Sequence, residues 1–177
     1  MKEFVHLHNH SDYSLLDATC TVENLIQAAA ENGMKAVALT DHGNLFGALK
    51  LYNYARKTNI KPIIGCEVYV APGSRFDKKR SGTNGTKPYY HLILIAQNEI
   101  GYRNLMKLSS LGYLEGFYYK PRVDKELLKT HSDGLIALSS CINGEVPSKL
   151  LRGDINGAKN AAVEYIEIFD GRYYLEL

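Results

Sequence analysis

The stretch PIIGCEVYV, residues 62–70, is a nearly continuous apolar run that holds a single carboxylate, Glu67. Apolar and β-branched residues over this length predict a strand. Residues 36–40, AVALT, form another continuous apolar run, of the type found in strands that are covered on both faces. A carboxylate buried in an apolar strand costs several kcal/mol unless a cation or strong donors compensate it. The stretch therefore predicts both a strand of the sheet and a charged partner for Glu67.

Segments with strand and helix character alternate on both sides of this stretch. We expect further strands at residues 4–9, 90–96, 134–140 and 173–177. Helical periodicity is found at residues 22–29 after an N-cap at Thr21, at residues 45–52 after Asn44, and at residues 100–111, 146–151 and 155–169. Six strands interleaved with helices predict an α/β fold with a parallel sheet, either open or closed into a barrel.

Composition and charge are those of one globular domain. The chain has 177 residues, of which 45% are hydrophobic and 23% charged, and its formal net charge of +2 is too small to indicate nucleic acid by itself. The first residues lack the apolar core of a signal peptide, and no run has the length of a membrane span, so we expect a cytoplasmic protein without a membrane partner. Three separated cysteines, Cys20, Cys66 and Cys141, favour reduced thiols.

Residues 72–88, PGSRFDKKRSGTNGTKP, interrupt the alternation with glycine and positive charge. The segment predicts an exposed loop, and two interpretations of it remain open. It is either a solvated loop without a partner or a nucleic-acid contact, in which case the candidate residues are Arg75, Lys78, Lys79, Arg80 and Lys87.

Potential metal ligands recur where the predicted strands end. In parallel α/β folds functional residues gather beyond the carboxyl ends of the strands. A lone His or Cys is more often an ordinary core residue, but seven residues at matching positions of successive strands predict a metal site. These are His8, His10, Asp17, His42, Glu67, His91 and Cys141.

Four neighbouring residues are weaker candidates. His6 lies one pleat deeper in its strand than His8, which favours a packed role or one behind the ligands. His131 precedes its strand and is expected at the opposite end of the sheet. Asp41 more plausibly orients a neighbour, and Asp12 a turn.

The sequence resembles a known family, the polymerase-and-histidinol-phosphatase (PHP) domain. The resemblance is to the branch of this family found at the N-terminus of the bacterial replicative DNA polymerase III alpha subunit. The resemblance covers essentially all 177 residues. It lies in HLHNHSDYSLLDA, ALTDHGNLFGAL, IKPIIGCEVYVAPGSRFDKK, YYHLILIAQNEIGYRNLMKL, GYLEGFYYKPRVDKELL and GLIALSSCINGEVPSKLL.

This resemblance implies a distorted (β/α)7 barrel with up to three divalent metals, which could be zinc, manganese or iron. By motif, His8 and His10 would bind one metal, and Glu67 would bridge it to a second metal that His91 and Cys141 also hold. Asp17 and His42 would bind a third. The family completes these sites with an Asp-x-His pair after a seventh strand, which the sequence does not contain. We therefore expect a PHP domain over residues 1–177, truncated after the sixth strand and without the palm and fingers of the polymerase.

The function that the resemblance implies is metal-dependent phosphoester hydrolysis, in the form of 3′–5′ exonuclease proofreading with Glu67, His8 and His10 at the reaction centre. The chain would then belong to a DNA-directed DNA polymerase, a nucleotidyltransferase of DNA replication. Its partners would be a DNA 3′ end or primer–template, the rest of the alpha chain and the replisome subunits. One alternative is a structural module that is stabilised by metal and braces the polymerase or a proofreading partner. Another is a small-molecule phosphatase of the histidinol-phosphate type.

Overall fold

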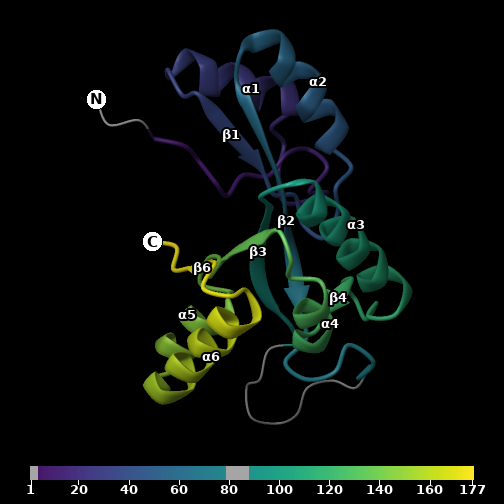
Figure 1. Ribbon diagram of the computed structural model, residues 1–177, viewed down its shortest axis with the longest axis vertical. Coiled ribbons are helices and arrows are strands. Elements are labelled where there is room, and N and C mark those ends of the chain that lie inside the picture. The colour runs from purple at the N-terminus through teal and green to yellow at the C-terminus, as the bar shows by residue number, and fades with distance from the viewer. Residues whose placement is uncertain (1–3, 79–87) are drawn as a thin grey trace.

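The computed structural model describes residues 4–78 and 88–177 (Figure 1). Its helices are α1 (Val22–Glu31), α2 (Ala48–Thr58), α3 (Glu99–Leu114), α4 (Lys125–Thr130), α5 (Glu145–Leu151) and α6 (Ile155–Ile168). Its strands are β1 (Ala36–Leu39), β2 (Lys61–Val70), β3 (Tyr90–Ala96), β4 (Arg122–Val123), β5 (Leu135–Leu138) and β6 (Tyr173–Tyr174). The predicted α/β class is confirmed.

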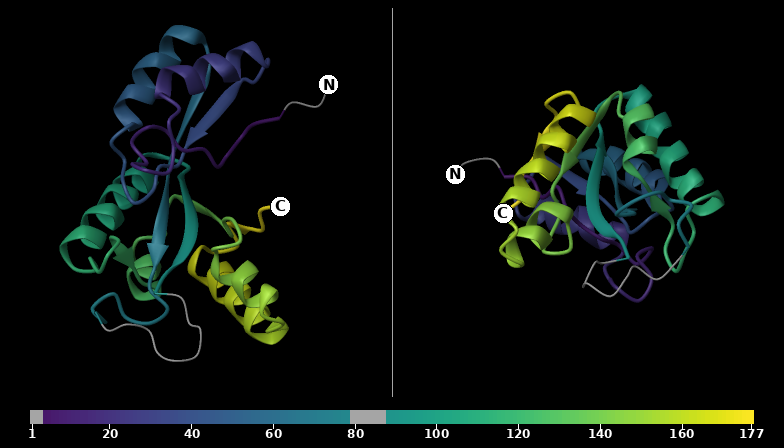
Figure 2. Two further views of the ribbon diagram at one scale, coloured as in Figure 1. Left: turned by 180° about the vertical axis from the view of Figure 1, so that it is seen from behind. Right: turned by 90° about the horizontal axis from the view of Figure 1, so that it is seen from below.

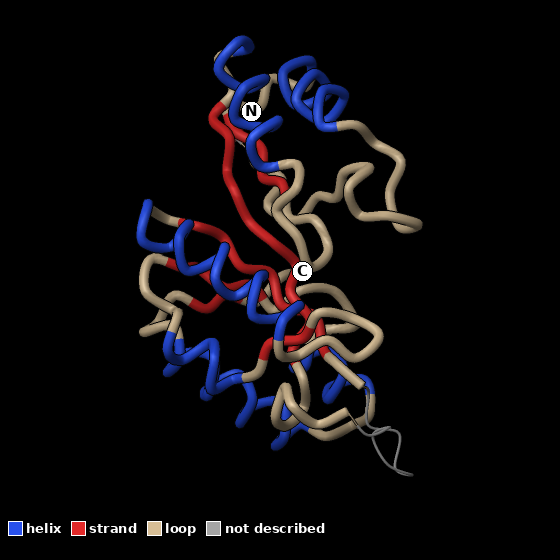
Figure 3. The backbone as a smooth tube through the Cα atoms, turned by 90° about the vertical axis from the view of Figure 1, so that its right-hand side faces the viewer, coloured by secondary structure: helices blue, strands red, loops and turns tan. Residues whose placement is uncertain are grey.

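The strands form one mixed sheet in the order β1-β2-β3-β5-β6, and β4 also pairs with β2. The long strand β2 is the centre of this arrangement, because its first half pairs with β1 and its second half with β3 and β4. Figure 3 shows β2 running between the two parts of the molecule. The β1/β2, β2/β4 and β5/β6 pairs are parallel, whereas β3 is antiparallel to both β2 and β5. The prediction of a parallel sheet is therefore wrong for β3.

The connection between β2 and β3 explains this direction. A parallel neighbour requires a crossover, usually a helix, whereas an antiparallel strand needs only a loop. Within the described residues between Val70 and Tyr90 the chain forms only bends and turns. Because β3 runs backwards, its first residues lie beside the last residues of β2, and His91 pairs with Tyr69. A histidine at the start of a strand thus reaches the same edge as the residues that end the parallel strands.

Two hydrophobic cores flank the middle of β2. The first lies among α1, α2 and β1 and includes Val22, Ile26 and Leu51, all of which are fully buried or nearly so. The larger core surrounds the second half of β2 and includes Leu105, Leu128 and Phe169 from α3, α4 and the end of α6. Figures 1 and 2 show α1, α2 and β1 grouped at one end of the molecule and the later helices around the rest. The junction of these two parts holds the site described below.

Side-chain caps define where most helices begin. Thr21 accepts a hydrogen bond from the Asn24 amide and starts α1 as expected, and Asn98 caps α3 in the same way. The prediction of a helix start at Asn44 is wrong, since α2 begins at Ala48. Asn44 instead accepts a hydrogen bond from the Phe46 amide, an Asx turn that competes with helix initiation.

The N-terminal segment is not the regular strand that its alternation predicts. The Ala38 amide donates to the carbonyl of His6, and the Thr40 amide donates to the carbonyl of Asn9. His6 and Asn9 are three positions apart, whereas their partners Ala38 and Thr40 are two positions apart. The segment therefore carries one extra residue relative to β1, and this prevents a continuous ladder of backbone hydrogen bonds between them. The predicted strand at residues 173–177 is likewise shortened to Tyr173–Tyr174.

The remaining expectations concern cysteines and membrane segments. All three cysteines are free thiols, with Cys66 buried and the other two exposed, so the prediction of reduced thiols is confirmed. In the part of the chain that the structure describes, no helix has the length and apolar character needed to span a membrane.

Candidate metal centre

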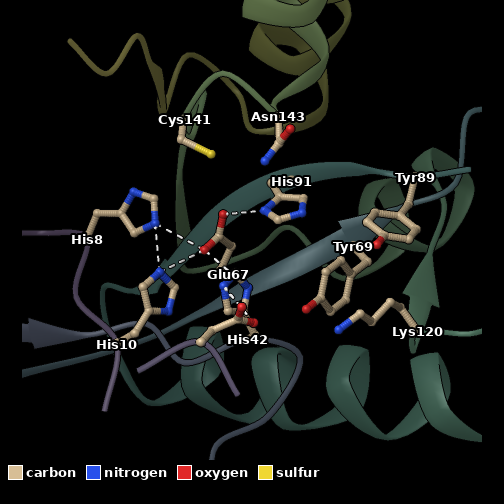
Figure 4. A pocket seen from close by; sticks show the side chains of 11 residues that line it. His8, His10, His42, Glu67, Tyr69, Tyr89, His91, Lys120, Cys141 and Asn143 are labelled. Atoms are coloured by element: carbon tan, nitrogen blue, oxygen red, sulfur yellow. Dashed lines mark hydrogen bonds and ion pairs between the residues drawn. The ribbon is translucent and has the colours of Figure 1, made fainter. Parts of the chain in front are cut away.

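Glu67 lies at the centre of the site, and its side chain is only 1% exposed (Figure 4). One carboxylate oxygen, Oε1, accepts a hydrogen bond of 2.7 Å from Nδ1 of His91 and another of 2.7 Å from Oγ of Ser140. Ser140 follows β5 and has a positive φ of 62°, a conformation that few residues other than glycine adopt. Residues from β2, β3 and the end of β5 therefore fix this oxygen.

The other oxygen of Glu67, Oε2, faces three histidines. It lies 3.0 Å from Nε2 of both His8 and His10, and 3.3 Å from Nδ1 of His42. The two Nε2 atoms of His8 and His10 are 3.1 Å apart. His10 and His42 also stack, with ring centroids 4.2 Å apart. These distances place several potential ligand atoms around one oxygen.

These contacts give two triads that share Glu67. In one, His8, His10 and Glu67 offer ligand atoms within 4.8 Å of one another, and in the other His42, Glu67 and His91 do so. A carboxylate that is common to two ligand groups has the geometry that a bridge between two cations needs. Five of the seven residues predicted as ligands thus converge.

The other two predicted ligands lie at the edge of the same pocket. Oδ2 of Asp17 is 3.8 Å from Nε2 of His42, and the Asp17 side chain is 54% exposed. Cys141 is exposed and lines the pocket without joining either triad within the described residues. The pocket is open and has a volume of about 520 Å³. It is lined by His8, His10, Asp17, His42, Glu67, Tyr69, Tyr89, His91, Lys120, Cys141 and Asn143.

Asp41 fixes the segment that carries His8 and His10. Its buried carboxylate accepts hydrogen bonds from the amide and hydroxyl of Ser11, at 2.7 and 2.8 Å, and from the hydroxyl of Ser14 at 2.7 Å. The Ser14 hydroxyl in turn accepts from the amide of His42. Asp41 therefore orients its neighbours, as expected, and it links the N-terminal segment to the chain that follows β1.

Glu176 is a member of the site that the sequence analysis missed. Nδ1 of His8 donates to Oε1 of Glu176 at 2.7 Å, and the Glu176 amide donates to the hydroxyl of Ser139. A carboxylate on the far nitrogen of an imidazole fixes the ring and its tautomer and so aims the other nitrogen. The signal was present in the sequence, since Glu176 is the one charged residue of the apolar stretch YYLEL.

His8 and His42 differ in their protonation states. Burial raises the pKa of Glu67, but hydrogen bonds from His10, His8 and His91 outweigh it and hold that pKa far below its ordinary value. Burial lowers the pKa of His8, yet its hydrogen bonds to Glu176 and Glu67 raise it to about 10. For His42 burial prevails over the nearby Glu67, and the pKa falls to about 4. At neutral pH and without metal, His8 is thus charged and His42 neutral.

The residues present fit divalent metal ions. Nδ1 of His42 is buried without a hydrogen-bond partner, although it points at the Glu67 carboxylate, and this is the state of a nitrogen that faces a cation position. Imidazole nitrogens and carboxylate oxygens, with the Cys141 thiol at the edge, suit zinc, manganese and iron. His8 and His10 with Glu67 would hold one ion, and His42 and His91 with Glu67 another.

Of the two interpretations of the basic loop, the nucleic-acid contact is not supported at Arg75. The Arg75 guanidinium donates to Glu115 at 2.6 Å and to both oxygens of Asp124, and its side chain is only 12% exposed. Arg75 therefore ties the loop to the ends of α3 and β4 and is not available to a phosphate. Lys78 is exposed. The other candidates, Lys79, Arg80 and Lys87, lie outside the described residues.

The weaker candidates lie away from the two triads. His6 is exposed and its ring contacts Phe4, so the packed role expected for it is wrong. Nδ1 of His131 contacts the Thr130 hydroxyl and the Leu127 carbonyl at the end of α4. Asp12 does not line the pocket, and its amide donates to the carbonyl of Cys20.

Comparison with known proteins places these residues in a family. The sequence profile of the PHP domain matches residues 6–177. The DNA polymerase III subunit alpha of Treponema pallidum is 53% identical over 175 residues, and that of Borreliella burgdorferi 51% over 174 residues. Each alignment covers 98% of this chain, but the chain spans only 15% of these curated relatives. A solved structure described as an amidohydrolase from Chromobacterium violaceum aligns with 63% of this chain and 34% of its own, at 20% identity and a TM-score of 0.40.

Proposed function

Because the chain belongs to the PHP domain family, we propose that it is the PHP domain of a bacterial DNA polymerase III alpha subunit and that it hydrolyses phosphodiester bonds with bound divalent metals. The identity of 45–53% with alpha subunits from several bacteria supports the polymerase assignment. In this proposal residues 1–177 are one PHP domain, and the palm and fingers belong to other parts of the alpha chain.

The observation that carries the proposal is the single buried carboxylate shared by two groups of histidines. When bound, divalent metals at such a site supply an activated water near neutral pH and neutralise charge on the phosphate. Ser140 and His91 hold Oε1 of Glu67 while three histidines surround Oε2, so the carboxylate cannot rotate without losing contacts. Glu176 holds His8 from behind. The chain thus provides a rigid donor set in a pocket that is open to solvent.

The substrate we propose is the 3′ end of DNA, trimmed in the 3′–5′ direction as in proofreading. The partners are then DNA, the rest of the alpha chain and the replisome subunits, and the location is the cytoplasm. Cys141 and Asp17 complete the ligand set from the edge of the pocket. The metal is zinc, manganese or iron, since the donor set suits all three.

A second candidate function is structural, and a specific observation favours it as well. The two triads join an irregular N-terminal segment to β2, β3 and the chain after β1, so metal bound there would cross-link segments that are distant in sequence. Binding free energy of such a metal is also folding free energy. In this case the site would stabilise the domain without performing chemistry.

One experiment separates the two functions. Protein purified without added metal is subjected to elemental analysis, and the same sample is incubated with a single-stranded oligonucleotide labelled at its 5′ end. Hydrolysis predicts a ladder of products shortened from the 3′ end, which chelator and Glu67→Gln both abolish. Bound metal without any ladder, together with a melting temperature that falls on chelation, would reject hydrolysis in favour of the structural function.

A further inference from the structure

Three residues that the metal centre does not use form one end of the pocket. They are Tyr69, Tyr89 and Lys120, which Figure 4 shows together, on the side away from His8 and His10. The ammonium group of Lys120 lies 5.3 Å from the centroid of the Tyr69 ring. The Tyr69 ring stacks on His42 with centroids 5.8 Å apart, and Tyr89 packs edge-on against it at 4.9 Å. Tyr69 thus contacts both a proposed metal ligand and Lys120.

The backbone holds Lys120 in an uncommon turn. The Tyr118 amide donates to the Lys120 carbonyl at 3.1 Å, and the residue between them, Tyr119, has a φ of 60°. A residue other than glycine pays about 1–2 kcal/mol for this left-handed conformation. The Tyr119 side chain is 72% exposed, so burial of its ring does not compensate the strain. Such strain is often found at functional sites, and Lys120 is the next residue in the chain.

Lys120 also differs in charge from the rest of the pocket. Among the described residues that line the pocket it is the only lysine or arginine, and the others are histidines, carboxylates, tyrosines, a thiol and an amide. A lysine ammonium is a compact positive charge that suits phosphate. The phenol hydroxyl of Tyr69 lies in the same pocket and can donate a hydrogen bond. Lys120 and Tyr69 together therefore present donors to an anion.

We infer that Lys120 and Tyr69 form a subsite for a second phosphate of a nucleic-acid strand, next to the phosphodiester that reaches Glu67. The inference deepens the proposed function and rests on it. Lys120 contacts Tyr69 and belongs to neither triad, whereas Tyr69 stacks on His42. This adjacency is the reason for assigning a neighbouring phosphate to Lys120. A substrate with two successive phosphates then gains a contact that a phosphate monoester lacks, and the pocket favours polynucleotides over small phosphate esters.

Binding of DNA without metal tests the subsite directly. We would measure fluorescence anisotropy of a labelled oligothymidylate with the metal-free 177-residue chain over a range of salt concentrations. Lys120→Gln should weaken binding about tenfold or more, since a hydrogen bond to a charged group is lost. It should also lower the slope of log affinity against log salt by ~0.7, the value for one phosphate contact on a single strand. Lys120→Arg should keep the slope of the parent.

Lys57 provides a matched control. Its ammonium lies 5.2 Å from the centroid of the Tyr54 ring, as Lys120 lies over Tyr69, but Lys57 is exposed on α2 and does not line the pocket. Lys57→Gln removes the same charge and should leave both affinity and slope unchanged. Equal effects of Lys57→Gln and Lys120→Gln, or an unchanged slope in Lys120→Gln, would overturn the subsite. Lys120→Met preserves the aliphatic stem against Tyr69 and replaces the glutamine variant if that variant does not fold.

A substrate with one phosphate separates this inference from the proposed function. With metal added, the parent should hydrolyse bis(4-nitrophenyl) phosphate and Glu67→Gln should not, whereas Lys120→Gln should lose a much smaller fraction of its activity on this ester than on the oligonucleotide. A parent that is inactive on this ester contradicts the proposed function, while the anisotropy measurement still decides the role of Lys120. If Lys120→Gln loses the same fraction of activity on both substrates, Lys120 acts on the reacting phosphate and the assignment to a second phosphate is wrong.

Discussion

The two triads that share Glu67 are held in different ways. His91 lies in β3, whose backbone pairs with β2. The backbone of His42 forms an isolated parallel β-bridge with that of Glu67. His8 and His10 come from an irregular segment that two backbone hydrogen bonds join to Ala38 and Thr40. Side-chain contacts, chiefly those of Asp41 and Glu176, supply the rest of its support. A residue in a paired strand keeps its place until the sheet unfolds, whereas a residue in an irregular segment can be displaced when one supporting side chain is removed. We call the side of the centre formed by His8 and His10 the His8–His10 half, and the side formed by His42 and His91 the other half. The His8–His10 half should therefore be the more easily disrupted.

The halves also differ in what metal binding must displace. His8, with a pKa near 10, has to lose a proton before it can bind a metal, whereas His42, with a pKa near 4, is already neutral at pH 7. Occupancy of the His8–His10 half should therefore depend more strongly on pH. One part of the centre is therefore ready to bind metal at neutral pH, whereas the other part becomes ready only when metal displaces a proton from His8.

The largest effect should follow loss of the residue that the two halves share. Glu67→Ala should remove more than one equivalent of metal, because both triads include this carboxylate. Elemental analysis after gel filtration measures this, with His131→Ala as a control that should retain the parental content. Equal metal in the Glu67 variant and the parent would contradict a shared carboxylate.

A smaller effect is expected from Asp41→Ala, which should weaken the His8–His10 half more than the half that holds His42 and His91. The substitution leaves the amide of Ser11 and two serine hydroxyls without their acceptor, at a cost of about 1–3 kcal/mol in unfolding free energy. Metal affinity of the His8–His10 half should fall ~10–100-fold, as for other groups that orient ligands. Urea denaturation and metal titration measure the two quantities. Asp133→Ala, at an exposed aspartate, is the control. Equal losses in both halves would show that the segment is not held independently.

The stability of the protein should depend on pH above 6.5 when metal is absent and should lose this dependence when metal is bound. A raised folded-state pKa stabilises the metal-free protein fully below the unfolded pKa of 6.5, and the contribution is lost as pH rises toward about 10. The melting temperature of the chelated protein should therefore fall between pH 6.5 and 10 more steeply than that of His8→Gln. With saturating metal the fall should vanish, because neutral His8 is the ligand. Parallel curves for parent and variant would contradict the charged state of His8.

The smallest effect should come from Glu176→Gln. This change keeps the shape of the side chain but removes the charge that contributes to the raised His8 pKa. We expect a lower His8 pKa in an NMR titration of the metal-free protein and about tenfold weaker metal binding in the His8–His10 half alone. Glu167→Gln, at an exposed position of α6, is the control. An unchanged His8 titration would show that Glu176 does not orient His8.

Residue chemistry predicted the centre of the site better than its supports. Glu67 is conspicuous because a carboxylate in an apolar strand requires compensation, and the alternating histidines before Asp17 are equally visible. The direction of β3 could not be predicted, since it depends on how the connecting loop folds back. The sequence nevertheless predicts His91 as a member of the site, although it predicts a parallel strand where β3 is antiparallel.

Contacts between distant parts of the chain account for the other differences. Glu176 meets His8 across 168 positions of sequence, and no local pattern indicates such a pair. In the sequence Arg75 is one of several basic residues in a predicted exposed loop. In the structure it pairs with Glu115 and Asp124, which are distant in sequence. The mismatch between the segment around His8 and β1 likewise depends on a partner strand and not on the alternation of the segment itself.

Anomalous diffraction from crystals soaked in Mn²⁺ would show whether the Glu67 carboxylate bridges two metals. We expect two anomalous peaks ~3.5–4 Å apart, the separation found in two-metal sites that act on phosphate. One peak should lie beside Nε2 of His8 and His10 and the other beside His42 and His91, and both should contact the Glu67 carboxylate. A single peak, or two peaks of which only one contacts Glu67, would show that the carboxylate is not a bridge.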